Sequence, residues 1–262
     1  MTASRLLSLH EEPVRLQVGE EAIFGLLHLP AGEAPAQGWP ALLMLHGFKG
    51  HKAGKHRLHT LFARHMAAQG VGVLRFDFRG YGDSQGDFAE VTPSRQLEDV
   101  SAAAEYLRAH SQLDPERLML LGHSLGGMLA ALAAGEVGPH RLALWAPALP
   151  EYFLQYLPGG RLPAGVQDAQ GWPLGRVFLQ EVLRQDPLKA AAAWGGVAAV
   201  LHGDADEACP PAWGERYAEA LGPGTPLALI EGADHTFNNL EAVQTLYTLT
   251  ARFLLGEELS AF

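Results

Sequence analysis

The chain has 262 residues and a formal net charge of −10, with 19 lysines and arginines against 29 acidic residues. This charge disfavours nucleic acid and anionic membrane surfaces as partners, and a hydrophobic content of 48% excludes a disordered chain. The single cysteine, Cys209, cannot form an internal disulfide, and residues 1–12 lack the apolar core of a signal peptide, so we expect a cytoplasmic protein without a membrane span.

The first elements in chain order are two strands, expected at 14–18 and 22–29, whose short connection through Gly19 predicts an antiparallel hairpin. From residue 41 on, short and nearly continuous apolar runs alternate with amphipathic segments, the pattern of a parallel sheet covered on both faces. The runs predict strands at 41–45, 71–76, 117–121, 141–145, 197–201 and 226–230. Helices are predicted at 56–69, 93–109, 125–134, 212–220 and 240–255. Thr92 followed by Pro93 is a strong start signal for the second helix.

These elements predict one α/β domain over residues 1–262, with a mostly parallel central sheet flanked by helices. One segment interrupts the alternation of strands and helices, at about residues 150–188. It is rich in proline, glycine and aromatic residues, and it follows a predicted strand. We interpret it as a small cap inserted into the domain.

The pattern Gly-x-Ser-x-Gly occurs once at a position where it has chemical meaning, in Gly122-His123-Ser124-Leu125-Gly126. The pattern directly follows a predicted strand and directly precedes a predicted helix. A sharp turn at this place projects the serine hydroxyl, and a Cβ on either flanking glycine would collide with neighbouring backbone. Ser124 is therefore the candidate nucleophile.

A serine nucleophile needs a base and an acid, which in this arrangement follow it in chain order. The candidate base is His235, in the loop between the last predicted strand and the last helix. The acid is expected in the loop after strand 197–201, where Asp204, Asp206 and Glu207 compete. We favour Asp206, with Asp204 second and Glu207 third.

The oxyanion formed during attack needs two backbone N–H donors. The residue after the nucleophile, Leu125, is expected to supply one of them. Phe48 is expected to supply the other from the loop after strand 41–45, because Gly47 lets the chain turn its following N–H inward. His46 is then a buried residue at the end of that strand rather than a base.

Two further patterns favour structural interpretations. The glycine-rich stretch from Arg75 to Ser84 does not have dinucleotide-binding spacing and predicts a loop beside the nucleophile turn. Four histidines suggest a metal site, but no carboxylate or thiol accompanies them, so we expect solvated or loop positions and no metal or cofactor. They are His51, His56, His59 and His65.

These motifs together resemble the α/β-hydrolase superfamily over nearly the whole chain, and bacterial cinnamoyl or feruloyl esterases most of all. The resemblance rests on the nucleophile turn, on Asp234-His235, and on His46-Gly47-Phe48, Gly50-His51-Lys52, Arg75-Phe76-Asp77, Gly80-Tyr81-Gly82-Asp83-Ser84, Gly86-Asp87-Phe88 and the run from His202 to Glu207. It implies an α/β-hydrolase fold, Asp206 as the acid, and an oxyanion hole that includes the N–H of Phe48. One departure is Leu125, where these esterases often carry glutamine, although its backbone N–H can still serve.

The sequence thus predicts a serine carboxylesterase that forms an acyl-enzyme and acts on a small-molecule ester, with hydroxycinnamoyl or short-chain acyl groups as the expected substrates. Thioester or peptide hydrolysis and other acyl transfer on the same residues are the alternatives. A binding protein that keeps the fold without the chemistry is a third, less favoured one. A homodimer is compatible with the sequence, which does not specify the oligomeric state.

Overall fold

The structure, a computed structural model, describes residues 10–257 and is built around an eight-stranded sheet. The strand order is β1-β2-β4-β3-β5-β6-β9-β10. The strands are β1 His10–Val18, β2 Glu21–Leu29, β3 Trp39–Leu45, β4 Gly72–Asp77, β5 Leu113–His123, β6 Arg141–Trp145, β9 Ala198–Gly203 and β10 Leu227–Ile230. β2 is antiparallel to both of its neighbours, β1 and β4, whereas the strands from β4 to β10 pair in parallel. The α/β class and the mostly parallel sheet predicted from the sequence are confirmed.

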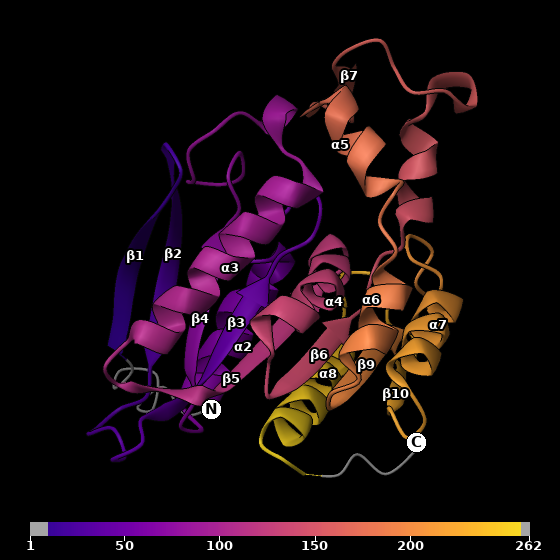
Figure 1. The fold of residues 1–262 in the computed structure, drawn as a ribbon. Coiled ribbons are helices and arrows are strands. Elements are labelled where there is room, and N and C mark those ends of the chain that lie inside the picture. The colour runs from indigo at the N-terminus through magenta and orange to yellow at the C-terminus, as the bar shows by residue number, and fades with distance from the viewer. Residues whose placement is uncertain (1–9, 258–262) are drawn as a thin grey trace.

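Helices cover both faces of this sheet (Figure 1). In that view α3, α4, α6 and α7 lie on the near face, and α2 and α8 lie behind the sheet. The helices are α2 Leu58–Ala67, α3 Pro93–Ala109, α4 Leu125–Val137, α5 Arg176–Val182, α6 Pro187–Trp194, α7 Pro211–Leu221 and α8 Leu240–Leu254. The predicted start of α3 at Thr92 is confirmed, since the Thr92 hydroxyl accepts the N–H of Arg95 at 3.2 Å and so caps the N-terminus of the helix.

Alternate side chains of each central strand enter two separate cores, as the two-residue period of a strand requires. In β3, Leu43 and Leu45 belong to the core under α3 and α4. Their neighbours Leu42 and Met44 belong to the core under α2 and α8. Burial on both faces explains why these strands appear in the sequence as continuous apolar runs.

The segment 150–186, here called the cap segment, stands above the carboxyl ends of the strands (Figure 1). It comprises the short helices η3 Pro150–Tyr156 and η4 Pro158–Gly160, a two-stranded ribbon of β7 Gln167–Asp168 and β8 Pro173–Leu174, and α5. Phe153, Phe178 and Leu179 are fully buried and join the core under α3 and α4. The alanine-rich α6 follows and packs beside α4, so the chain has returned to the helical layer by residue 187.

Several predicted elements start at other residues in the structure, and the first strand, predicted at 14–18, begins at His10. The helix predicted at 56–69 begins at Leu58, because His56 and Arg57 have φ of 52° and 63° and the segment Lys55–Arg57 forms the separate turn η1. The strand predicted at 117–121 begins at Leu113, which pairs with Trp39 before a register shift in the β3–β5 ladder. Among the helices of residues 10–257, none has the length and apolar character needed to cross a membrane.

Candidate active site

Ser124 occupies the sharp turn between β5 and α4. Its φ and ψ are 58° and −122°, a conformation that L-residues rarely adopt and that costs on the order of 1–3 kcal/mol. The turn depends on its glycines, because a Cβ on Gly122 would lie 2.1 Å from the carbonyl oxygen of Gly126. A Cβ on Gly126 would lie 2.3 Å from the carbonyl oxygen of Leu45. The expected need for glycine on both sides of the serine is therefore confirmed.

A continuous chain of hydrogen bonds connects Ser124 with His235 and Asp206. His235 Nε2 lies 2.9 Å from Ser124 Oγ, and His235 Nδ1 lies 2.7 Å from Asp206 Oδ2. Asp206 is buried, with 4% of its surface exposed. The structure thus brings together the three side chains that the sequence singled out, from the loops after β5, β9 and β10.

The environment of Asp206 favours the ionised carboxylate. Burial alone would raise its pKa, but hydrogen bonds from His202 and His235 and from the Cys209 N–H outweigh burial and hold the pKa of Asp206 below its ordinary value. The N–H groups of Ala208 and Cys209 donate to Oδ1 at 2.9 and 2.8 Å. The carboxylate can therefore keep the proton of His235 on Nδ1, which leaves Nε2 free to accept the serine proton.

The two other candidate acids lie elsewhere. Asp204 accepts the N–H of Gly232 at 2.7 Å and so ties the loop after β9 to the loop after β10. Glu207 is exposed. Neither carboxylate is hydrogen-bonded to His235 within the part of the chain that the structure describes.

His202 is a site residue that sequence reasoning missed. It is fully buried, and its Nε2 lies 2.8 Å from the carbonyl oxygen of Cys209 and 3.2 Å from Asp206 Oδ2. Both neighbours are acceptors, so Nε2 carries the proton and donates to them. A histidine at the end of a buried strand, four residues before the acid, was the available signal.

The loop after β3 lies directly against the serine. A Cβ on Gly47 would be 3.0 Å from the Cβ of Ser124 and 3.4 Å from its Oγ. Within residues 10–257, the backbone N–H groups of Phe48 and Leu125 donate to no protein acceptor. His46 is buried as expected, and its ring is fixed between the carbonyl oxygen of Gly47 at 2.9 Å and the N–H of Phe78 at 3.3 Å.

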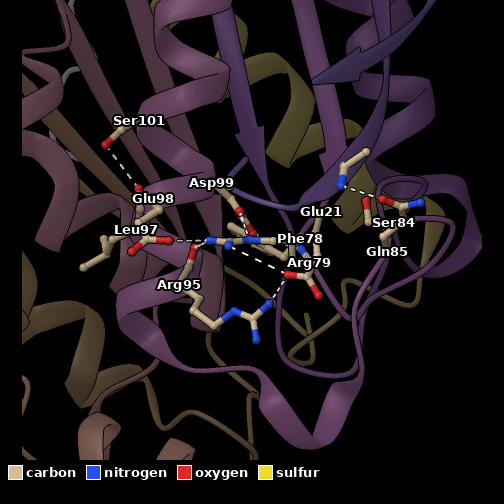
Figure 2. A network of polar contacts seen from close by, with 12 residues as sticks. Glu21, Phe78, Arg79, Ser84, Gln85, Arg95, Leu97, Glu98, Asp99 and Ser101 are labelled. Atoms are coloured by element: carbon tan, nitrogen blue, oxygen red, sulfur yellow. Dashed lines mark hydrogen bonds and ion pairs between the residues drawn. The ribbon is translucent and has the colours of Figure 1, made fainter. Parts of the chain in front are cut away.

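The loop after β4 is held in place by the network of polar contacts around Arg79 (Figure 2). Arg79 Nε contacts Asp99 Oδ1 at 2.5 Å, and its Nη2 contacts Glu98 Oε2 at 2.7 Å. On the other side of the loop, the Ser84 hydroxyl accepts the N–H of Phe24 from β2 at 2.9 Å. The network holds the buried Tyr81 ring 5.0 Å from the ring of His46. The glycine-rich stretch is therefore a structural loop beside the nucleophile turn, as predicted.

A hollow of about 310 Å³ opens beside Ser124. It is bounded by His235 and Thr236 on one side and by the segment 46–59 on the other, and no residue of the cap segment lines it. Tyr156 and Trp172 of the cap segment pack on Phe48 and Phe88, with ring centroids 5.7 and 4.6 Å apart.

Two histidines of the site are kept neutral by burial. Burial lowers the pKa of His123 to about 4, and its Nε2–H donates to the carbonyl oxygen of His235 at 2.9 Å. Burial also lowers the pKa of His59 well below its ordinary value. The expectation of a solvated or loop position for His59 is wrong, since the residue lies in α2 with 2% of its surface exposed. Helical spacing placed it on the face that packs against the sheet.

Comparisons with known proteins agree with this architecture. The sequence model of the family described as "Serine aminopeptidase, S33" matches residues 39–171. The uncharacterized protein YfhR of Salmonella typhimurium is 34% identical over 104 residues, which cover 39% of this chain and 32% of YfhR. The thiohydrolase aneE of Aspergillus aculeatus is 41% identical over 96 residues, covering 36% of this chain and 29% of that protein. The chain thus spans about a third of the length of these curated relatives.

Among solved structures, ferulic-acid-bound Est1E from Butyrivibrio proteoclasticus superposes with a TM-score of 0.83. It is 20% identical in sequence, and the match covers 93% of this chain and 98% of that one. This likeness concerns the fold. The chain belongs to the serine aminopeptidase S33 family of the α/β-hydrolase superfamily.

Proposed function

We propose that the protein is a serine esterase that cleaves carboxylic esters through an acyl-enzyme. The observation that carries the proposal is the hydrogen-bonded chain from Ser124 Oγ through His235 to Asp206, with distances of 2.9 and 2.7 Å. A serine hydroxyl becomes an effective nucleophile only when a base in contact accepts its proton. Ionised Asp206 holds the imidazole in the required tautomer and stabilises the imidazolium that forms.

The reaction has two steps. In the first, Ser124 Oγ attacks the ester carbonyl while His235 takes its proton, and the backbone N–H groups of Phe48 and Leu125 hold the developing oxyanion. His235 then protonates the departing alcohol as the bond to the acyl group breaks. In the second step, water activated by His235 attacks the acyl-enzyme and releases the acid. Each proton taken by His235 is returned, so the cycle needs no cofactor.

Acyl specificity is proposed for short-chain or hydroxycinnamoyl groups. Phe48, whose ring packs on Phe153 and Phe178 at 5.3 and 5.5 Å, lines the hollow next to the proposed oxyanion hole and offers an apolar wall suited to flat or short acyl groups. The ferulic acid named for Est1E supports the same choice. Thioester hydrolysis is the second candidate, because aneE, which is 41% identical over the 96 matched residues, is named a thiohydrolase.

The test combines labelling with turnover. A fluorophosphonate probe should label the wild-type protein and not Ser124→Ala, and 4-nitrophenyl acetate should give a burst of nitrophenol before steady turnover. Full turnover by Ser124→Ala would overturn the proposal. A panel of acetate, decanoate and hydroxycinnamate esters, with an acetyl thioester of matched size, then separates the candidates. A strong preference for long chains would contradict the proposed acyl specificity and leave the mechanism intact.

A further inference from the structure

The hollow beside Ser124 is unusual in its charge. The chain contains only four lysines, and three of them fall between residues 49 and 55. Lys49 and Lys55 line the hollow, and no aspartate or glutamate does. In a protein of net charge −10 this is a local concentration of positive charge at the mouth of the proposed active site.

Of these three lysines, Lys55 has the fewest polar contacts in the described residues: neither Lys49 nor Lys55 has an anionic partner there, but Lys49 Nζ contacts three oxygens of the cap segment. Lys52 is paired with Asp77 and Asp83 at 2.6 and 2.5 Å. Lys49 Nζ reaches over the Phe48 ring to the side-chain oxygen of Gln170 at 2.7 Å. Lys55 Nζ contacts the Thr236 hydroxyl at 3.4 Å and forms no ion pair within residues 10–257.

Asp234, two residues before Thr236, already accepts hydrogen bonds from its own loop. Asp234 Oδ1 accepts the N–H groups of Thr236 and Asn238 at 3.2 and 2.9 Å. These hydrogen bonds, together with the charge of Lys55, outweigh burial and hold the pKa of Asp234 below its ordinary value. Lys55 attracts Asp234 but forms no ion pair with it in the described residues, so its ammonium can also contact an anion that enters the hollow.

The backbone that carries Lys55 is strained and tightly held. Gly54, His56 and Arg57 have φ of 69°, 52° and 63°. For the two residues other than glycine this conformation is unfavourable. The His56 ring is hydrogen-bonded to the side chain of Asn238, and the carbonyl oxygen of Ala53 accepts the N–H of His59 at 3.1 Å. These contacts hold the loop in its strained conformation and so fix the direction in which the loop presents Lys55.

His59 adds a polar group that no protein atom uses. It lines the hollow, and its buried Nε2 has no hydrogen-bond partner in the described part of the chain. Most buried polar atoms in native proteins are paired, so an unpaired one beside a cavity indicates a missing partner. Burial keeps the imidazole neutral, so it adds no charge to the hollow.

We propose that this hollow is the leaving-group subsite, and that it selects esters whose alcohol carries a carboxylate or a similar anion bound by Lys55. The assignment to the leaving group rests on the proposed function. His235 must protonate the departing alcohol oxygen, so that part of the substrate lies on the His235 side of Ser124. His235 and Thr236 line the hollow, and Lys55 Nζ contacts the Thr236 hydroxyl, so a group held next to His235 comes close to Lys55; the Phe48 wall of the same hollow is left for the acyl group.

The test uses two acetate esters with the same acyl group, 4-acetoxybenzoate and its neutral methyl ester. The measured quantity is the ratio of their kcat/KM values, compared between variants so that the different reactivity of the two phenols cancels. Lys55→Gln should lower this ratio about fivefold, mainly through the KM of the anionic ester, as expected for one partly exposed ion pair. Lys189→Gln is the matched control, because Lys189 is exposed on α6 and does not line the hollow.

The wild-type ratio should also fall as salt rises, because screening weakens the attraction between Lys55 and the carboxylate. An unchanged ratio in Lys55→Gln, with the neutral ester still hydrolysed by the wild type, would overturn the subsite and leave the proposed esterase standing. Failure of the wild type to hydrolyse either ester would overturn both proposals.

Discussion

Replacement of Asp206 by asparagine is the sharpest test of the proposed mechanism. The side chain keeps its size, and its remaining oxygen can still accept the N–H groups of Ala208 and Cys209. The group that faces His235 Nδ1 at 2.7 Å changes from a charged acceptor to an amide donor. His235 must then turn its unprotonated nitrogen toward residue 206, and Nε2 carries the proton and cannot accept one from Ser124.

The size of the effect follows from the geometry. At 2.7 Å and an effective dielectric constant of about 20, the attraction between a carboxylate and the imidazolium is at most about 6 kcal/mol. This corresponds to a loss of about 10⁴ in rate, the magnitude known for the loss of the acid in serine hydrolase triads. We therefore expect Asp206→Asn to lower kcat for 4-nitrophenyl acetate by about 10³ to 10⁴ at pH 8, with a native circular dichroism spectrum.

Asp204→Asn is the matched control. An asparagine oxygen can still accept the N–H of Gly232, which Asp204 accepts at 2.7 Å, so kcat should stay within about twofold of the wild type. A kcat of Asp206→Asn within tenfold of the wild type would refute the reasoning. An equal loss in both variants would refute the choice of Asp206 over Asp204.

Three further variants or conditions test the surroundings of the site. Gly47→Ala places a Cβ 3.0 Å from that of Ser124 and should lower kcat by about 10- to 100-fold with little change in KM. Gly135→Ala is the control, because a Cβ there has no neighbour within 4 Å. It should leave kcat unchanged and raise the free energy of unfolding in urea by about 0.5–1 kcal/mol. Arg79→Met leaves the fully buried Asp99 without its cation and should lower the free energy of unfolding by about 3–5 kcal/mol. Most of this loss should be regained in the double variant Arg79→Met, Asp99→Leu. A single variant as stable as the wild type would contradict this prediction. Burial lowers the pKa of three histidines to about 4, namely His28, His46 and His123. Between about pH 6.5 and pH 4 these three histidines are protonated in the unfolded chain and neutral in the folded protein. The free energy of unfolding should therefore fall by about 4 kcal/mol for each unit by which the pH is lowered near pH 5. A slope under about 1 kcal/mol per pH unit in urea unfolding would be inconsistent with neutral buried histidines.

The elements that the sequence predicted well are those whose signal is local. The strands buried on both faces appear as apolar runs, and the cap at Thr92 depends on adjacent residues only. The turn at Ser124 also belongs here, because the glycines at 122 and 126 are required by backbone contacts at 2.1 and 2.3 Å. Chain order then restricted the acid and the base to two loops, which parallel strands bring to the same edge of the sheet.

The elements that the sequence did not predict depend on distant contacts. His56 and Arg57 fit a helical pattern, yet the hydrogen bond from His56 to Asn238 holds this stretch in a left-handed turn. The start of β5 at Leu113 depends on pairing with Trp39. The residues Asp114-Pro115-Glu116, which separate Leu113 from the strand predicted at 117–121, resemble a loop in the sequence. The folding of the cap segment onto Phe48 through Phe178 joins residues far apart in sequence. Short-range patterns carry no information on any of these contacts.

The position of Phe48 has a consequence for how specificity and turnover are related. On the proposed mechanism its N–H stabilises the oxyanion, while its ring stacks on Phe178 of the cap segment at 5.5 Å. The adjacent Lys49 reaches Gln170 of the same segment at 2.7 Å. A change in the cap segment therefore acts, on the proposed mechanism, on the donor that holds the transition state, and it should alter kcat for every ester. Lys55 has no hydrogen bond or ion pair with the cap segment in the described residues, so on the proposed mechanism it can tune the choice of alcohol separately. The acyl side is thus coupled to catalysis through Phe48, and the alcohol side can vary with little effect on the chemical step.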